Sequence, residues 1–380
     1  MLNAENKIWL DKTIEKAKKK LSKTTRQIGD TIPFTTKNGI FDDKYTIDPI
    51  NGDGMYWWTN GFYPGILWLM YLETKDEFYK TTAESIEKKM DKALLGFEGL
   101  HHDVGFMWQT SAIADYKITG NNKSKNRGML AASILASRYN LNGGYIRAWN
   151  DDRVGWGIID CMLNIPILYW ASRESKDDRF AAIARAHADK AAKHFIREDG
   201  SVKHIVVFDE NTGEEKESLG GQGYAVGSSW SRGQAWALYG FVLSYIHTKN
   251  EKYLNIAKKV AHYFISCIQE DFIPDCDFRA PKTPIVKDSS AGAIAACGLI
   301  EISKYVGEEE KALYLNNAVN ILKSLTDKCA DFSEDCQELL KMGTGAYHEE
   351  NSRNMSLIYG DYYYLEALLK LKGNEVLFWG

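Results

Sequence analysis

The sequence predicts an all-α fold, an (α/α)6 barrel in which six inner helices are surrounded by six outer helices. Two kinds of helical segment alternate along the chain, and each kind occurs six times. The pattern recurs at intervals of about 50 to 70 residues, as in a helical repeat that closes on itself. Signals for β-strands are few. We therefore expect residues 1–380 to form a single domain without a linker.

The inner segments are apolar or small nearly all the way round, which is typical of helices packed on every side. They are predicted at residues 61–73, 105–118, from about 162 to 170, 231–246, 291–305 and 361–371. Pro166 fits the start of the third segment, because the N–H groups in the first turn of a helix have no intrahelical partner.

The outer segments carry one apolar stripe and one charged face, the pattern of helices that cover a core. They are predicted at residues 5–22, 76–95, 124–139, 177–196, 250–268 and 308–325. Two short stretches, GGYIRAW from Gly143 and VKHIVVFD from Val202, alternate as strands do and are expected to form small ladders in loops.

Composition narrows the class of partner. The formal net charge of -4 is spread over interspersed lysines and glutamates, so nucleic acid and anionic membranes are not expected partners. The N-terminus lacks an apolar signal core, and the six cysteines form no CxxC pair. We expect a cytoplasmic protein with reduced thiols and without a cofactor.

Asp160 is a single carboxylate in the apolar run from Gly155 to Pro166. A buried charge is costly unless it is paired, neutralised or used. One interpretation is an N-cap aspartate, because Asp is common at that position. The other is a functional acid beside Trp156.

If the helices alternate between inner and outer positions, the N-termini of all inner helices meet at one mouth. Helix N-termini favour anions, and aromatic, amide and carboxyl side chains at such a mouth are typical of a carbohydrate site, here for an acidic sugar. The loops expected there carry Trp57, Trp58, Thr59, Asn60, His101, His102, Asp103, Trp149, Asp160, Gln222, Arg232, Asp288, Ser289, Ser290 and Tyr359.

Sugar hydrolysis needs a carboxyl group that gives a proton, so Asp160 and Asp103 are the candidates. Asp103 could instead cap the helix that follows it. His101 and His102 adjoin it, but adjacent residues do not easily converge on one ion and no third ligand stands nearby, so we expect no metal. The glycine-rich loop at Gly220 lacks the GK[ST] ending of a phosphate-binding loop.

Three other residues allow both a structural and a functional interpretation. His204 alternates with apolar neighbours, as an ordinary strand histidine does. Arg232 begins an apolar helix, and a buried arginine requires a carboxylate partner. Trp236, taken alone, is typical of a core residue.

Four motifs, in order, resemble the unsaturated glucuronyl hydrolases of glycoside hydrolase family 88. They are HHDVGFMW at 101–108, GWGIIDCMLNIPILYWA at 155–171, GGQGYAVGSSWSRGQAWALYG at 220–240 and GDYYYLEALL at 360–369. The resemblance runs from about Trp57 to the C-terminus. It implies an (α/α)6 barrel and a cytosolic, metal-free enzyme whose substrate is an unsaturated uronic-acid-containing di- or oligosaccharide.

The resemblance also implies a reaction and a set of residues. An acid protonates C4 of the C4=C5 enol ether, water adds at C5, and the hemiketal opens to release the remaining sugar. Asp160 matches the general acid and base, and Asp103 matches a second carboxylate that orients the sugar. The residues that match sugar-contacting positions are His204, Gln222, Arg232 and Trp236. Members expected in the same pocket are Trp57, His102 and Trp149.

One departure from the family concerns sulfate. Members that accept sulfated disaccharides resemble one another in an S-x-x-S-x-K element before the terminal GDYYYLEA. Residues 346–351 here read AYHEEN, and two acids repel a sulfate. We therefore expect a preference for unsulfated substrates. The alternatives are an unsaturated rhamnogalacturonyl hydrolase with the same barrel, and a sugar epimerase or sugar-binding barrel.

Overall fold

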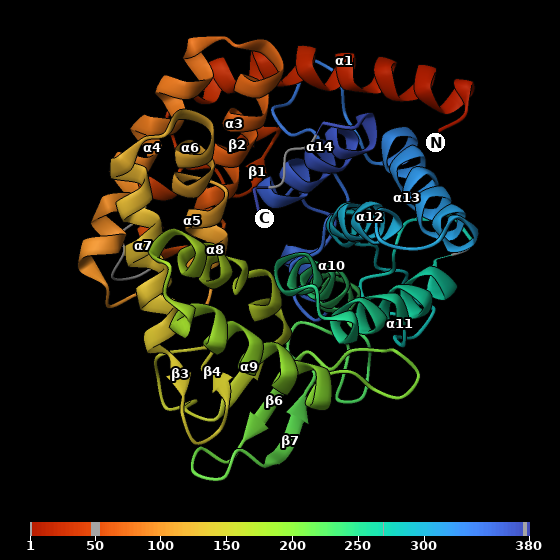
Figure 1. The fold of residues 1–380 in the computed structure, drawn as a ribbon. Helices are drawn as coiled ribbons and strands as arrows, with labels where there is room; N and C mark the ends of the chain where they lie inside the picture. The colour runs from red at the N-terminus through yellow and green to blue at the C-terminus, as the bar shows by residue number, and fades with distance from the viewer. Residues whose placement is uncertain (1, 47–53, 269, 375–377) are drawn as a thin grey trace.

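The described helices form two concentric rings, which confirms the predicted (α/α)6 barrel (Figure 1). The structure is a computed structural model and describes residues 2–46, 54–268, 270–374 and 378–380. The inner ring consists of α3 (Phe62–Thr74), α5 (Val104–Gln109) with α6 (Ala112–Thr119), α8 (Pro166–Ser175), α10 (Ser231–Thr248), α12 (Ser289–Ser303) and α14 (Ile358–Lys372). The outer ring consists of α1 (Ala4–Ile28), α4 (Glu77–Gly96), α7 (Asn122–Ser137), α9 (Asp178–His194), α11 (Glu251–Cys267) and α13 (Glu308–Lys328).

Burial separates the two rings as the sequence pattern predicts. Every residue of the inner helix α12 is buried. In the outer helix α11 the buried residues recur three or four positions apart, at Tyr253, Leu254, Ala257, Val260, Ala261, Phe264 and Ile265. An apolar stripe of this kind holds an outer helix on the inner ring, because burial of apolar surface stabilises the fold by about 25 cal/mol per Å².

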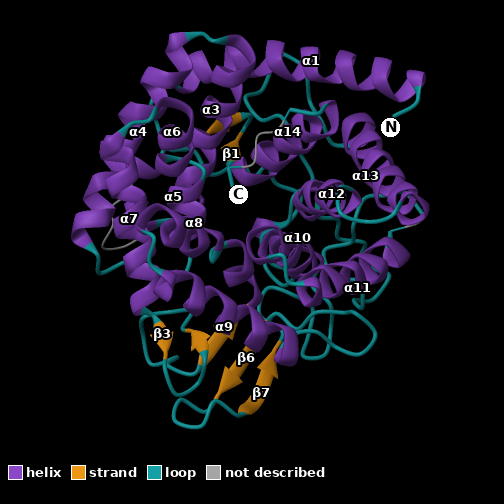
Figure 2. Ribbon diagram, viewed as in Figure 1, coloured by secondary structure: helices purple, strands orange, loops and turns teal. Residues whose placement is uncertain are grey.

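Three small sheets lie in the loops (Figure 2). One antiparallel sheet contains β5 (Trp156–Ile158), β6 (Ile205–Phe208) and β7 (Glu215–Leu219). The other two are β1 (Thr36–Lys37) with β2 (Ile40–Phe41), and β3 (Tyr139–Asn140) with β4 (Tyr145–Ile146). In the larger sheet Ile158 pairs with Ile205, which brings the chain before Asp160 next to the chain after His204.

Two inner helices differ from their expected form. The segment 105–118 is divided into α5 and α6, because the Thr110 hydroxyl donates to the Gly61 carbonyl and the Ser111 hydroxyl donates to the Met107 carbonyl. Such side-chain bonds to backbone bend helices. The helix after Asp160 begins at Pro166 rather than near Met162, and a 3₁₀ helix, η4 (Ile159–Leu163), precedes it.

Further short 3₁₀ helices are η1 (Lys44–Thr46), η2 (Gly54–Tyr56), η3 (Trp58–Gly61) and η5 (Glu350–Ser352). The first outer helix continues to Ile28, beyond the expected Ser22, and α14 begins three residues before the expected Asp361.

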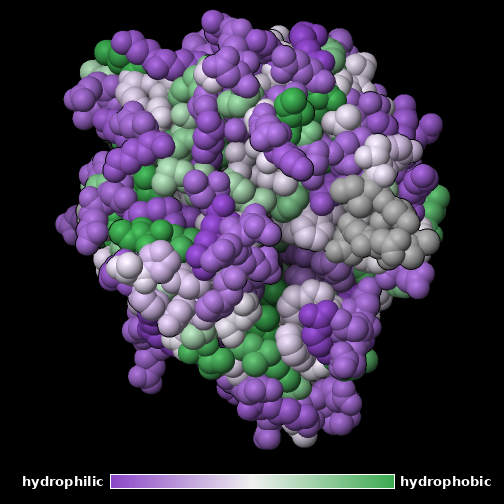
Figure 3. Space-filling model, turned by 180° about the vertical axis from the view of Figure 1, so that it is seen from behind, coloured by the Kyte–Doolittle hydropathy of each residue, from purple (hydrophilic) through white to green (hydrophobic). Residues whose placement is uncertain are grey.

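The surface seen from behind is mostly hydrophilic, with separate hydrophobic patches, and it is recessed near its middle (Figure 3). Among the described helices, none has both the length and the apolar character needed to cross a membrane.

Candidate active site

The N-terminal ends of the inner helices are linked by side-chain contacts around the barrel mouth. The ring of Trp58 lies 5.4 Å from Phe106 in α5 and 4.8 Å from Tyr359 in α14, between ring centroids. The Arg232 guanidinium of α10 lies 5.5 Å from the Tyr359 ring and binds Asp288, which precedes α12. The mouth therefore gathers residues that are far apart in sequence.

Asp160 lies in η4, at the end of strand β5, with 13% of its side chain exposed. Its Oδ1 atom lies 3.5 Å from Nε2 of His204. The backbone N–H of Ile159 donates to the His204 carbonyl at 3.1 Å, which fixes the two segments side by side. The N-cap of α8 is Ile165, so Asp160 does not cap that helix.

The hydrogen bonds of His204 define its tautomer. The Gln222 backbone N–H lies 3.1 Å from Nδ1, and an N–H can only donate, so Nδ1 is an acceptor. The Gly220 carbonyl also lies 3.3 Å from Nδ1, but it is the more distant contact. Neutral His204 therefore carries its proton on Nε2, which faces Asp160. Within the described chain, neither that nitrogen nor Asp160 Oδ1 has a hydrogen-bond partner within normal distance.

Asp103 occupies the N-cap position of α5, but its side chain accepts no capping hydrogen bond. Its carboxyl instead accepts from the Asn164 amide, with Nδ2 3.1 Å from Oδ1. Nδ2 of Asn164 also lies 3.2 Å from the Asp160 carbonyl. One buried amide therefore joins the two segments that carry the candidate carboxyl groups.

His102 and Asp103 lie within hydrogen-bonding distance of each other. Nδ1 of His102 is 2.8 Å from the Ala148 carbonyl, which can only accept, so Nδ1 is protonated. Nε2 lies 3.2 Å from Asp103 Oδ1. Burial raises the pKa of Asp103 well above its usual range, the nearby Asp160 charge raises it further, and burial lowers the pKa of His102. Both shifts favour a neutral pair, in which the Asp103 carboxyl donates to His102.

The structure corrects the argument that His101, His102 and Asp103 do not easily converge, because their donor atoms all lie within 4.8 Å of one another. Hydrogen bonds engage one of the possible ligand atoms of each residue: the Asp103 N–H donates to His101 Nδ1 at 3.4 Å, His102 Nδ1 binds the Ala148 carbonyl, and Asn164 donates to Asp103 Oδ1. We therefore do not assign them as metal ligands.

Arg232 and Gln222 both hold the segment at residues 344–347. Arg232 is 1% exposed and donates to Asp288 at 2.6 Å, to the Thr344 carbonyl and to the Gly345 carbonyl. The Gln222 side chain donates to the same Gly345 carbonyl at 2.9 Å. The carboxylate partner that the sequence required for Arg232 is thus Asp288.

The three predicted tryptophans occupy different places. Trp149 is half-buried and packs edge-on against His102 at 5.6 Å. Trp57 is half-buried against Phe34. Trp236 is completely buried, and its ring lies 4.9 Å from Phe106 in the barrel interior.

Sequence reasoning missed the contributions of Asn164, Trp58 and Asp288. Asn164 is a polar residue in an apolar run, four positions after Asp160, and that spacing could have drawn attention to it. Trp58 and Asp288 were expected at the mouth, but nothing in the sequence indicates which partners they contact.

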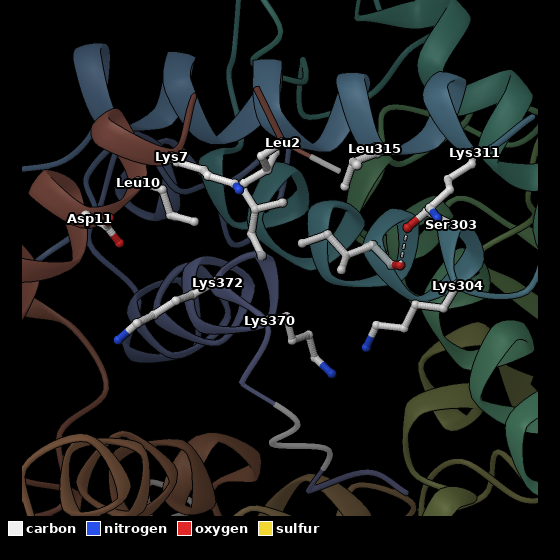
Figure 4. Close-up of a pocket in the computed structure, with 12 residues that line it drawn as sticks. Leu2, Lys7, Leu10, Asp11, Ser303, Lys304, Lys311, Leu315, Lys370 and Lys372 are labelled. Atoms are coloured by element: carbon white, nitrogen blue, oxygen red, sulfur yellow. Dashed lines mark hydrogen bonds between the residues drawn. The ribbon is translucent and has the colours of Figure 1, made fainter. Parts of the chain in front are cut away.

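A separate cavity of about 390 Å³ lies where α1, α12, α13 and α14 meet, and none of the predicted site residues line it (Figure 4). It is lined by Leu2, Lys7, Leu10, Asp11, Ile300, Ser303, Lys304, Lys311, Leu315, Lys370, Leu371 and Lys372.

Comparisons with known proteins identify the family of this chain and agree with its fold. The family model of Glycosyl Hydrolase Family 88 matches residues 34–364. An unsaturated glucuronyl hydrolase from Bacillus sp. strain GL1 is 35% identical over 372 residues, covering 94% of this chain and 95% of the relative. An unsaturated chondroitin disaccharide hydrolase from Streptococcus pneumoniae is 35% identical over 333 residues, covering 85% and 83%.

A solved structure of the unsaturated glucuronyl hydrolase from Streptococcus agalactiae is also similar, with a TM-score of 0.91 and 33% identity, covering 98% of this chain and 94% of that chain. The barrel and the family match define a helical-barrel glycoside hydrolase. The chain belongs to glycosyl hydrolase family 88.

Proposed function

We propose that this enzyme hydrolyses unsaturated glucuronyl di- and oligosaccharides by hydrating the C4=C5 bond of the terminal uronic acid. The observation that carries the proposal is the joining of Asp103 and Asp160 by Asn164, with His204 facing Asp160. A similar solved structure, of a Streptococcus agalactiae enzyme mutant, holds dGlcA-GalNAc6S, a ligand of the proposed class.

In the proposed reaction, the Asp160 carboxyl gives a proton to C4, and positive charge develops at C5 and the ring oxygen. The resulting carboxylate takes a proton from water as the water oxygen bonds to C5. The C5 hemiketal then opens to a ketone at C5 and leaves a hemiacetal at C1. The hemiacetal forms an aldehyde as its hydroxyl proton passes to the leaving oxygen and the bond between C1 and that oxygen breaks, so one water is consumed in all. The Nε2–H of His204 orients Asp160 during both proton transfers.

Asp103 and His102 supply a hydrogen-bonding pair beside this acid. A neutral Asp103 adds no second negative charge near the reacting carboxyl, so it can bind sugar hydroxyl groups without opposing proton transfer by repulsion. We assign Asp103 the role of orienting the sugar, together with Trp149, which packs against His102.

Ultraviolet absorbance tests the activity, because hydration removes the conjugated C4=C5 bond. We expect the purified enzyme to abolish the absorbance of an unsaturated chondroitin disaccharide. Turnover of an unsaturated rhamnogalacturonyl disaccharide alone would instead support an unsaturated rhamnogalacturonyl hydrolase. Unchanged absorbance with both substrates would support an epimerase or a binding protein.

We also propose a preference for unsulfated substrates. The segment 344–347 is bound by Gln222 and Arg232, and the acids that follow it, Glu349 and Glu350, are exposed. Two carboxylates at this edge of the site repel a sulfate group. Rates measured on 6-sulfated and unsulfated chondroitin disaccharides test this, and faster turnover of the sulfated substrate would contradict it.

A cytoplasmic location is part of the same proposal. All six cysteines are free thiols and four of them are buried, which suits a reducing compartment.

A further inference from the structure

The orientation of the Asn164 side-chain amide is fixed by its partners. Its Oδ1 atom accepts the backbone N–H of Phe106 at 2.7 Å, so the other end of the amide must be the nitrogen. That nitrogen has two hydrogens and two acceptors, the Asp103 carboxyl and the Asp160 carbonyl. Each polar group of this completely buried amide is therefore satisfied.

The backbone around Asn164 is packed tightly enough to hold this geometry. A Cβ atom on Gly105 would lie 2.4 Å from the Asn164 carbonyl oxygen, 2.5 Å from its Cα and 2.7 Å from its Oδ1. Only glycine allows α5 to approach η4 this closely. The N-terminus of α5 and the segment after Asp160 are thus in direct contact, and the amide crosses that contact.

The Asp103 carboxyl has two neighbours on the same oxygen. Asn164 Nδ2 approaches Oδ1 from the η4 side, and His102 Nε2 approaches it from the adjoining loop. Loss of the Asn164 donor would leave Oδ1 with His102 alone, and the other oxygen, Oδ2, with only the longer contact of 3.4 Å to His101 Nδ1. The charged or titratable groups that face this part of the site are Asp103, Asp160, His101, His102, His187, His204, Arg138 and Cys161.

We propose that Asn164 is a positioning residue for the hydrolytic reaction: its amide holds Asp103 at a fixed distance and orientation from Asp160. This inference rests on the proposed function. Asn164 acts through the two aspartates, so it governs the rate of the chemical step rather than the affinity for the sugar. If the amide of Asn164 had only a structural role, its substitution would lower stability without a selective loss of kcat.

The variant Asn164→Asp tests the role most directly. It keeps an oxygen for the Phe106 N–H but removes both donated hydrogens. We expect kcat to fall on the order of 10- to 100-fold with a smaller change in KM, because an Asp103 that is no longer held can still contact the sugar but no longer aligns it with Asp160. Protonation of the introduced carboxyl restores one donor, so the ratio of variant to wild-type kcat should rise as pH falls.

Gln234→Glu is the matched control. Gln234 is also a completely buried amide, and its nitrogen donates to the Gly200 and Val260 carbonyls, away from both aspartates. It should lower the melting temperature without the selective loss of kcat. An equal kcat loss in both variants, or a loss in Asn164→Asp that falls on KM alone, would overturn the inference.

Histidine ¹⁵N NMR provides a readout that does not depend on activity. Asn164→Asp should shift the His102 Nε2 resonance, because His102 shares the Asp103 oxygen that Asn164 binds, whereas Gln234→Glu should not. If wild type is inactive on the unsaturated disaccharide but the resonance shifts, the proposed function fails and the positioning geometry stands. An unshifted resonance with unchanged kcat would refute the role of Asn164 and leave the function intact.

Discussion

Nε2 of His204 and Oδ1 of Asp160 face each other at 3.5 Å, and neither atom has a closer hydrogen-bond partner in the described chain. The contact is longer than a normal hydrogen bond. Catalytic hydrogen bonds are often long in a free enzyme and shorten when substrate is bound. We therefore expect this contact to shorten when the sugar binds.

Two substitutions of His204 distinguish the contributions of its two ring nitrogens to activity. The amide nitrogen of His204→Gln takes the place of Nε2 and keeps a donor near Asp160, whereas His204→Asn reproduces only the Nδ1 position beside Gln222. We expect His204→Gln to retain more activity, with His204→Asn losing about 10- to 100-fold in kcat. Steady-state kinetics measure both. The reverse order would show that the Gln222 contact, rather than the Asp160 contact, governs the rate.

Breaking the Arg232–Asp288 pair should be strongly destabilising, because both side chains are almost completely buried and the remaining charge would have no carboxylate partner. Asp288→Asn leaves the Arg232 charge without its carboxylate partner. We expect the free energy of unfolding to fall by about 3 to 5 kcal/mol, measured by urea denaturation. Asp178→Asn, which breaks the exposed pair with Arg185, is the control and should change little. Similar losses in both variants would contradict this account.

Glu87 should make the protein less stable as pH rises. The Ser124 hydroxyl lies 2.7 Å from Glu87 and 2.6 Å from Asp115 but has one hydrogen, so it can donate to only one of the two carboxyl groups. Burial, and then the Asp115 charge, raise the pKa of Glu87 to about 8 from its usual 4.5. The folded state therefore keeps a proton that the unfolded state releases, and this contribution to stability is lost as pH rises from the unfolded to the folded pKa.

Urea unfolding between about pH 5 and pH 8 measures this effect in wild type and in Glu87→Gln. The wild type should lose up to about 1.4 kcal/mol per pH unit more than the variant over that range. Glu214→Gln, at an exposed position, should leave the wild-type slope unchanged. Parallel curves for wild type and Glu87→Gln would exclude the assigned proton.

Gly105→Ala should damage both stability and activity, because the added Cβ meets backbone atoms of Asn164 that cannot move aside. We expect about 1 to 3 kcal/mol of destabilisation and a lower kcat. Gly307→Ala is the control, since a Cβ there meets nothing within 4 Å. Thermal melts and kinetics on the two variants check the prediction, which fails if Gly105→Ala behaves like Gly307→Ala.

The alternation of inner and outer helices was predictable, because the hydrophobic pattern of each segment, taken by itself, indicates its position in the barrel. The all-buried α12 and the one-sided α11 have sequences that indicate their positions directly. The break between α5 and α6 was not predictable, because it depends on the Thr110 hydroxyl reaching Gly61, a residue of the preceding inner segment. The segment 105–118 contains no proline or interior glycine to mark that break.

The candidate site was likewise predictable only in part from the sequence. Asp160 and Asp103 stand out in the sequence because each is an acid beside apolar or aromatic residues. Asn164, which joins the two segments, does not stand out in the sequence, because its partners come within hydrogen-bonding distance only when α5 and η4 pack together. Arg232 required a carboxylate, but the identity of Asp288 depends on how α10 and α12 meet.

The substitution Asp160→Asn tests the central claim most directly. It preserves shape but removes the acid, so the absorbance of an unsaturated chondroitin disaccharide should remain when the variant is added, while wild type abolishes it. Circular dichroism and melting temperature should match wild type, which separates lost chemistry from lost folding. Wild-type activity in a folded Asp160→Asn protein would contradict the assignment of Asp160 as the acid that protonates the sugar.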